Sequence, residues 1–319
     1  MGLEPSLKAG RLKAGRLKVG RLKVGRLKVG RPAIVRSASR RWLAMGAAIA
    51  AFGQACAFAG EPAPAPTRVV SLDLCTDQLL IELAQRDRIA AVTHLAADPA
   101  VSAIPEKARG LPITHGNAED VLRYDPDLVL AGPFGVTSTV DLLRRLGRHV
   151  VVVPLPQDLD GVRASVRVVA GAVGEAAKGE ALIGELDRRL SALAPPANPA
   201  PTALIYQVGG SVSGPGSLAD AILTAAGLRN MSAAYRLSRG GQVPLESLIA
   251  KPPDLLVLAS NEDEYRTALA DSLRHPIIRR LRERGASVEL PWRLWLCGTP
   301  HIADAIERLA GVRIEARGR

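Results

Sequence analysis

The chain has 319 residues, 47% of them hydrophobic, and carries 42 Lys and Arg against 31 Asp and Glu, a formal net charge of +11. The excess lies at the start, because residues 1–59 hold 13 of the basic residues and one acid, which leaves 29 basic and 30 acidic residues after them. The body of the chain is therefore close to neutral, which removes the main support for nucleic-acid binding, and no nucleic-acid partner is expected. That body of 260 residues is long enough for two lobes of about 130 residues each.

Residues 1–59 are expected to be a leader that is removed. Leu7 to Arg31 is five copies of Leu-Lys-(Ala/Val)-Gly-Arg. One interpretation is a basic arm that binds nucleic acid or anionic lipid. We favour the other, an expanded repeat that is translated because the start codon was placed too far upstream. Arg40-Arg41, an uncharged run and the Ala-x-Ala site ending at Ala59 form a secretory signal peptide. We expect export to the periplasm, with a twin-arginine route and lipid attachment at Cys56 as weaker alternatives.

Residues 60–157 alternate short buried strands with helices, as is typical of an α/β lobe with a parallel sheet. Strands are expected at residues 68–72, 89–92, 128–131 and 150–153, and helices at residues 78–84 and 140–146.

Residues 159–193 have the strongest helical pattern in the chain, with apolar side chains recurring at helical spacing from Leu159 to Leu193. Asp158 or Asp160 can cap the start, and Ala-Pro-Pro ends the pattern. One helix of about 50 Å is predicted, although four glycines inside it allow a kink or a break.

A repeated motif flanks this helix. Glu119 and Glu246 each begin a short amphipathic helix that is followed by a Pro-Asp turn and a buried strand. The repeat predicts two similar lobes, residues 60–157 and 195–319, joined by a helix at 158–194. The expected fold is α/β, with two Rossmann-like lobes and one long interlobe helix.

The C-terminal lobe shows the same alternation of strands and helices. Strands are expected at residues 203–208, 255–259 and 287–290, and helices at residues 218–226, 271–284 and 301–310. The glycine-rich stretch at 209–217 lacks the spacing of a phosphate-binding loop, so we interpret it as a loop that shapes a ligand site.

In open α/β sheets, ligands bind beyond the carboxyl ends of the strands. The loops expected there contain Cys75 and Cys297, the two cysteines that remain after leader removal. The pair forms a disulfide across the chain in an oxidising compartment, or contacts a metal complex as soft ligands with His115 or His301 nearby, or is two unrelated thiols. All three alternatives stay open at this point.

Two tryptophans, Trp292 and Trp295, follow the last expected strand, with Arg293 between them. Aromatic residues make up only 3% of the chain, so two in one loop favour a flat apolar wall against a large ligand. The alternative is that they fill a gap in the core.

The sequence lacks the common catalytic motifs. It contains no Gly-x-Ser-x-Gly and no His-Glu-x-x-His, and Asp73 and Asp77 are typical of turn and cap residues. An enzyme has no positive support, and no cofactor is expected.

The chain resembles the periplasmic substrate-binding proteins of ATP-binding-cassette (ABC) importers, in the subgroup for cobalamin, haem and ferric siderophores. The resemblance spans about residues 67–311 and is carried by RVVSLDLCTDQLL, NAEDVLRYDPDLVLAG, the long helix, GPGSLADAILTAAGLRN and PLESLIAKPPDLLVL. It implies the helical-backbone (class III) architecture, in which one rigid helix joins two lobes.

The resemblance also implies roles for residues. A glutamate on each lobe engages arginines of the membrane permease, and Glu119 and Glu246 match those positions. The ligand lies between the lobes. The residues that this places near it are Cys75, His115, Tyr206, Trp292 and Trp295, with Arg293 and Cys297 beside them.

Two function classes follow. The first is a monomeric solute-binding protein that captures a corrinoid, haem or ferric siderophore and delivers it to a dimeric inner-membrane permease. The second is a chelatase-like enzyme on a related scaffold, which would handle a metal at His115 or His301.

Overall fold

The structure is a computed structural model that describes residues 64–134, 136–259, 275–283 and 287–312. The predictions about the basic repeat, the signal peptide, Cys56 and the start of the helix at 271–284 lie outside these ranges. Residues 61–319 form a compact unit of their own. None of the helices in the described part of the chain combines the length and apolar character needed to cross a bilayer.

The N-terminal lobe is built on a five-stranded parallel sheet in the order β3–β2–β1–β4–β5. The strands are β1 (Val69–Ser71), β2 (Ile89–Thr93), β3 (Ile113–Thr114), β4 (Leu128–Ala131) and β5 (Val150–Val152). The helices of this lobe are α1 (Leu74–Leu83), α2 (Pro105–Ala108), α3 (Ala118–Arg123) and α4 (Thr137–Arg145). The chain order reverses between β1 and β4, which makes their carboxyl ends the switch point of the sheet.

Helices cover both faces of this sheet, which explains why the sequences of its central strands are continuous apolar runs. One face packs a core cluster against α1, and the other packs a second cluster against α3 and α4. All four residues of β4 are buried.

The C-terminal lobe has a mixed sheet in the order β11–β10–β6–β7–β9, with β8 paired to β6. Its strands are β6 (Thr202–Tyr206), β7 (Ser211–Ser213), β8 (Arg229–Asn230), β9 (Gly240–Gln242), β10 (Leu255–Leu258) and β11 (Ser287–Glu289). Its helices are α7 (Leu218–Ala225), α8 (Leu245–Ala250), α9 (Pro276–Glu283) and α10 (Ile302–Ala310). Pairing is parallel except for β7, which runs antiparallel to β6 and β9. The predicted glycine-rich loop is therefore partly a strand, β7.

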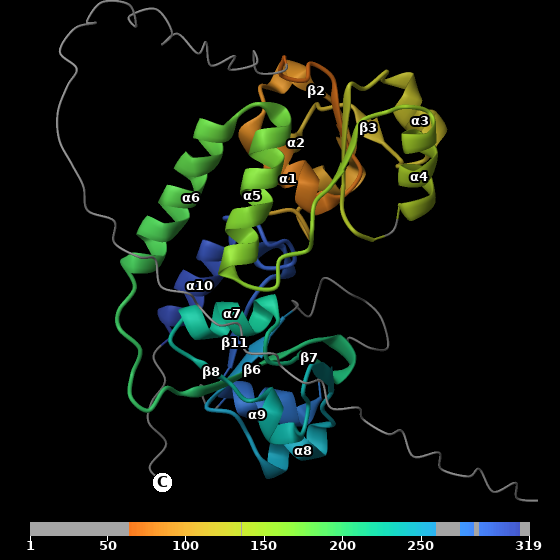
Figure 1. Cartoon of the computed structure of the whole chain (residues 1–319). Helices are drawn as coiled ribbons and strands as arrows, with labels where there is room; N and C mark the ends of the chain where they lie inside the picture. Colours follow the sequence, from red (N-terminus) through yellow and green to blue (C-terminus); the bar gives the residue numbers. More distant parts are fainter. Residues whose placement is uncertain (1–63, 135, 260–274, 284–286, 313–319) are drawn as a thin grey trace, which may run out of the picture. The chain divides into compact units, whose positions relative to one another are not determined.

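The prediction of one continuous helix between the lobes is wrong, and the break that its glycines allowed is present. The segment forms two helices, α5 (Leu159–Val173) and α6 (Ala176–Ser191), which lie side by side (Figure 1). Gly174 adopts φ 76°, and the Glu175 N–H donates to the Ala170 carbonyl oxygen at 2.7 Å. This left-handed glycine is a helix C-terminal cap, so the chain turns back instead of continuing.

The α5–α6 hairpin contributes to the cores of both lobes. Val166 and Val169 belong to the N-terminal core cluster, together with Ile183 of α6. Val162 and Leu186 belong to the C-terminal cluster instead. The hairpin therefore connects the two lobes, as the single predicted helix was expected to do. The predicted cap is confirmed, because the Asp158 carboxylate accepts a hydrogen bond from the Gly161 N–H at 2.7 Å.

The repeated motif is confirmed as α3–β4 in one lobe and α8–β10 in the other. Its Pro-Asp turn has the same role in each lobe. Asp127 accepts hydrogen bonds from the backbone N–H and hydroxyl of Thr67, at 2.6 and 2.9 Å. Asp254 accepts the same two bonds from Thr202, at 2.8 and 2.7 Å. Each aspartate therefore fixes the segment that begins the central strand of its lobe, β1 or β6.

Candidate ligand site

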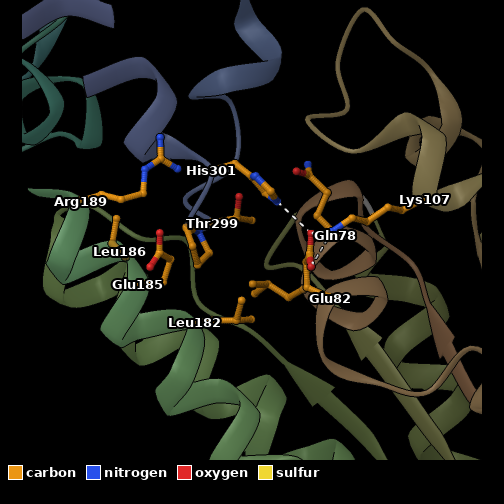
Figure 2. Close-up of a pocket in the computed structure, with 11 residues that line it drawn as sticks. Gln78, Glu82, Lys107, Leu182, Glu185, Leu186, Arg189, Thr299 and His301 are labelled. Carbon is orange, nitrogen blue, oxygen red and sulfur yellow. Dashed lines mark hydrogen bonds and ion pairs between the residues drawn. The ribbon is translucent and has the colours of Figure 1, made fainter. Parts of the chain in front are cut away.

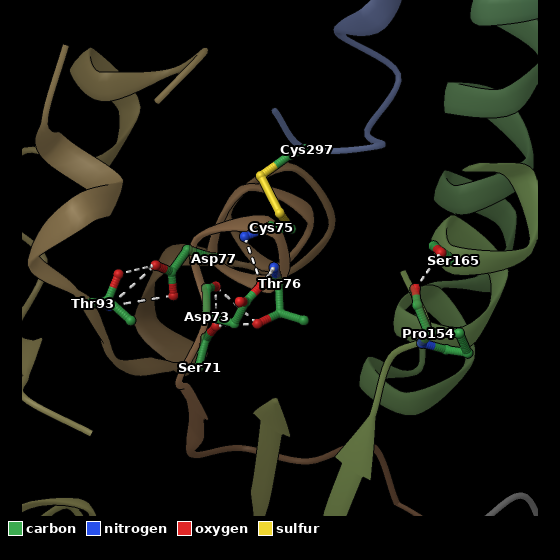
Figure 3. Close-up of a disulfide and its surroundings, with 9 residues drawn as sticks. All are labelled: Ser71, Asp73, Cys75, Thr76, Asp77, Thr93, Pro154, Ser165 and Cys297. Atoms are coloured by element: carbon green, nitrogen blue, oxygen red, sulfur yellow. Dashed lines mark hydrogen bonds between the residues drawn. A yellow bond between two sulfur atoms is a disulfide. The ribbon is translucent and has the colours of Figure 1, made fainter. Parts of the chain in front are cut away.

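Helix α1 begins four residues earlier than predicted, at the carboxyl end of β1. Its cap is Asp73, whose carboxylate accepts a hydrogen bond from the Cys75 N–H at 2.9 Å (Figure 3). The Thr76 hydroxyl lies 2.7 Å from that of Ser71 and donates to the Asp73 carbonyl oxygen at 2.9 Å. These bonds hold the first turn of α1, with Cys75 in it, at the end of the sheet where ligands bind.

Cys75 and Cys297 are joined by a disulfide, with their Cα atoms 5.1 Å apart (Figure 3). The bond connects the N-terminus of α1 in one lobe to the loop between β11 and α10 in the other, across 222 residues of sequence. With both sulfurs in the disulfide, neither cysteine is a thiolate ligand for a metal.

Asp77 is a buried carboxyl group below this turn. Its side chain accepts hydrogen bonds from the Thr93 hydroxyl at 2.5 Å and from the Thr93 N–H at 3.2 Å, which ties α1 to the end of β2 (Figure 3). Burial raises the pKa of Asp77 to about 7, although the Thr93 bonds oppose the shift. The prediction that Asp77 is a loop or cap residue is wrong, because it lies inside α1 and clips two elements together.

A small pocket of about 50 Å³ lies at the switch point. Its walls are the segments that follow β1, β4 and β5, the start of α1, and Gly298 of the opposite lobe. Phe134 and Leu155 line it and are 70% and 41% exposed. Exposed apolar side chains at the carboxyl ends of parallel strands are typical of a ligand site.

Two glycines permit the close packing around this pocket. A Cβ atom on Gly132 would lie 2.7 Å from the Asp73 carboxyl group, and one on Gly298 would lie 2.6 Å from the ring of Pro156. The first contact brings β4 against the cap of α1. The second seats the C-terminal lobe on the loop before α5.

Phe134 and Leu155 were not among the predicted site residues, although both follow predicted strands at their carboxyl ends. The signal was present in Gly132-Pro133-Phe134, a turn that carries one of only three phenylalanines in the chain.

Trp292 and Trp295 form an edge-to-face pair with ring centroids 6.3 Å apart and an interplanar angle of 69°. Both indoles are half-buried and pack against the core of the C-terminal lobe. The structure therefore supports the core-filling alternative over a flat wall of exposed rings. Arg293, between them, is also half-buried.

Tyr206 is not available to a ligand in this structure, contrary to expectation. It is 2% exposed, belongs to the core under β6, and its hydroxyl group donates to the Val243 carbonyl oxygen at 3.2 Å. The segment around Val243 covers it, which the sequence pattern of the strand does not reveal.

The two candidate metal-binding histidines lie in different loops and have different neighbours. His115 is exposed after β3, and its backbone N–H donates to the Asp120 carboxylate at 2.7 Å. His301 precedes α10, and its Nε2 lies 3.2 Å from Oε1 of Glu82. Within the described ranges, no group of three or more His, Cys, Asp or Glu side chains is placed to hold a metal ion.

Glu119 and Glu246 occupy matching positions. Each is the second residue of a short helix, α3 or α8, and each side chain is exposed. Asn117 caps α3 through a hydrogen bond from the Asp120 N–H at 2.8 Å.

The profile of the periplasmic binding protein family matches residues 69–282, from β1 into α9. The chain belongs to the periplasmic binding protein family. Membership implies a periplasmic location, and the two α/β lobes are those of its helical-backbone (class III) members, here with the α5–α6 hairpin between them.

A cobalamin-binding protein of Halobacterium salinarum is 30% identical to the chain over 217 residues. The match covers 66% of this chain and 58% of the relative, so the chain spans less than two thirds of that relative's length.

Solved structures of periplasmic binding proteins share the fold. The haem-binding protein RhuT from Roseiflexus sp. RS-1 superposes with a TM-score of 0.61 at 23% identity, over 76% of this chain and 96% of its own. The haem-binding protein HutB of Vibrio cholerae gives 0.62 at 18% identity, over 76% and 97%. The vitamin B12-binding protein BtuF of Vibrio cholerae gives 0.56 at 16% identity, over 77% and 95%.

Proposed function

We propose that the protein is the solute-binding component of an ABC importer, which captures a metal chelate between its lobes and delivers it to a permease. The observation that carries the proposal is the family match over both lobes. The lobes meet at the carboxyl end of the N-terminal sheet, where such folds bind their ligands.

The proposed ligand is a metal chelate: a corrinoid, haem or a ferric siderophore. The names of the relatives support this class, since they are cobalamin-binding, haem-binding and vitamin B12-binding proteins. Phe134 and Leu155 offer it apolar contact beside the disulfide. The pocket of about 50 Å³ is far below the roughly 300–1,000 Å³ of drug-sized ligand sites, so it holds an edge of the chelate and not the whole.

The ligand is tested by calorimetric titration of residues 60–319 with cobalamin, cobinamide, haem and ferric siderophores. We expect saturable binding of one of them. Phe134→Ala should weaken it about tenfold, because the ring contributes on the order of 1–2 kcal/mol of apolar contact. Leu146→Ala removes another exposed apolar side chain, on a residue outside the pocket lining, and is the matched control. No binding across the panel, or equal loss in both variants, would contradict the proposed ligand site.

Two further residues of the N-terminal lobe have proposed ligand roles. The Cys75–Cys297 disulfide forms part of the site wall as a closed bond. His115 is the proposed contact to the metal of the chelate, because it is exposed and follows β3 at the carboxyl ends of the parallel strands. His115→Ala should change the visible spectrum of a bound haem or corrinoid, and an unchanged spectrum would remove His115 from the site.

Permease docking is proposed for Glu119 and Glu246. Their exposure at the same place in two similar lobes gives a two-point surface for a pseudo-symmetric partner that presents arginines. We expect Glu119→Ala with Glu246→Ala to abolish transport while ligand affinity is retained, as measured by uptake in cells and by calorimetry. The double variant Glu106→Ala, Glu283→Ala removes two other exposed acids as a control. Normal uptake by the docking double variant would end the proposal.

The chelatase alternative required turnover at His115 or His301. The His301 imidazole contacts the Glu82 carboxylate, and His301 and His115 lie in different loops. We therefore propose binding without turnover.

A further inference from the structure

A second pocket of about 190 Å³ lies beside α1, on the side of α6 (Figure 2). It is lined by Gln78, Leu79 and Glu82 of α1, by Lys107, by four residues of α6 and by Thr299, Pro300 and His301. Leu79 lines both this pocket and the one at the switch point, so one turn of α1 separates the two. We name it the α1–α6 pocket.

The charged groups of the α1–α6 pocket already have opposite charges beside them. The Lys107 ammonium lies 2.8 Å from the Glu82 carboxylate, which the His301 imidazole also contacts (Figure 2). The hydrogen bond from His301, with help from Lys107, lowers the pKa of Glu82 to about 2, against the opposing effect of burial. Glu82 is therefore ionised and neutralised within its own cluster.

The other two charged groups are paired in the same way. Arg189 binds Asp304 and Glu307 at 2.6 and 2.5 Å, and Glu185 binds Arg188 at 2.5 Å. With two acids and two bases in the wall, all matched, the pocket offers no unmatched charge to an ionic ligand.

Gln78 is different. Its side chain is 1% exposed, and neither the Oε1 nor the Nε2 atom has a hydrogen-bond partner among the residues that the structure describes. A buried primary amide left without partners costs about 1–3 kcal/mol for each unsatisfied group, so such groups are normally met by water or by a ligand. Figure 2 shows this amide beside the ring of His301, at the upper edge of the pocket.

We infer that the α1–α6 pocket binds a small neutral molecule that carries a carboxamide group. A carboxamide presents a donor next to an acceptor, which matches the free acceptor and donor of Gln78 in one cyclic pair. Leu79, Leu182 and Leu186 supply apolar contact for the rest of the molecule. A cavity of about 150 Å³ holds benzene, so this pocket of about 190 Å³ fits a ligand slightly larger than benzene, a ring with one small substituent.

The inference does not depend on the chelate proposed for the other site. Carboxamides reach the protein either as free small molecules or as side arms of a larger ligand such as a corrinoid, and the α1–α6 pocket is assigned to the free amide. The test separates the two sources by comparing benzamide with cobinamide.

The experiment is a calorimetric and thermal-shift titration of residues 60–319 with benzamide, with benzoate as the anionic molecule of the same shape. We expect benzamide to bind saturably and to raise the unfolding midpoint, and benzoate to do neither. Gln78→Leu should lose benzamide affinity by about tenfold or more, because the paired hydrogen bonds are gone. The variant should fold at least as well as the wild type, since it replaces an unpaired buried amide by an apolar group. Gln85→Leu, at an exposed position just beyond α1, is the matched control.

A direct readout needs no variant: the side-chain amide NMR signals of Gln78 should shift with benzamide and not with benzoate. If benzamide does not bind, or binds Gln78→Leu as well as the wild type, water alone satisfies Gln78 and the inference is overturned. If cobinamide affinity falls in Gln78→Leu as well, the amide arm of a larger ligand is the source and the assignment to free amides is wrong.

Discussion

At the scale of single residues, polar groups at the start of α1 fix this helix to the N-terminal sheet. Asp73 caps the helix, Thr76 bonds back to the strand, and Asp77 holds Thr93 of the neighbouring strand. The last of these is a buried carboxyl group whose pKa is raised by loss of water contact.

Asp77 predicts a pH dependence of stability. In the unfolded chain its carboxyl group ionises near 3.8, and in the folded protein near 7, so between these values only the folded state keeps the proton. The contribution of Asp77 to the free energy of unfolding is therefore fully present below pH 3.8. It is lost as the pH rises towards 7, by up to about 1.4 kcal/mol per pH unit. Asp77→Asn cannot ionise, so its free energy of unfolding should lack this decline and exceed that of the wild type at pH 8. Urea unfolding between pH 4 and pH 8 measures it, and equal pH slopes in the two proteins would show the account to be wrong.

At the scale of elements, sequence patterns predicted what local composition controls. The strands β4 and β10 are buried apolar runs between a Pro-Asp turn and a glycine or polar loop, and the pattern located both. The Asp158 cap followed from its position before the first apolar residue. Short strands such as β7 and β9, three residues each, depend on partners elsewhere in the chain and left no local signal.

Other features of the site could not be read from local patterns either. Gly174 was one of four glycines in the predicted helix, and nothing local marked it as the residue that turns left-handed. Tyr206 ends a strand in a position typical of a ligand contact, yet the segment around Val243 covers it. The repeat, by contrast, predicted that the two glutamates occupy matching places in the two lobes.

The break between α5 and α6 gives a prediction with its own control. Gly174→Ala should destabilise the protein by about 1–2 kcal/mol, because φ 76° strains any other residue and the new Cβ would lie 2.7 Å from the Cβ of Ala65. Gly184→Ala, inside α6 with nothing within 4 Å, should instead stabilise it by about 0.5–1 kcal/mol. Chemical denaturation of both variants gives the comparison. Equal effects would mean that α5 and α6 form one continuous helix.

At the scale of the whole molecule, the disulfide fixes one lobe to the other beside the switch point. We expect no free thiol in residues 60–319 of the exported protein, as counted under denaturing conditions. Cys75→Ser with Cys297→Ser should lower the free energy of unfolding by about 2–5 kcal/mol, since the bond closes a very long loop. Two titratable thiols in the native protein, or an unchanged stability in the double variant, would contradict this connection.

We propose that the two lobes capture a chelate and release it unaltered. Equilibrium dialysis of residues 60–319 against the chelate that binds in the calorimetric panel tests this proposal, with mass spectrometry of the ligand recovered after denaturation. We expect about one chelate bound per chain and recovery of the same chelate with its metal in place. Recovery of a demetallated or otherwise altered molecule would make the protein an enzyme, and the claim would be wrong.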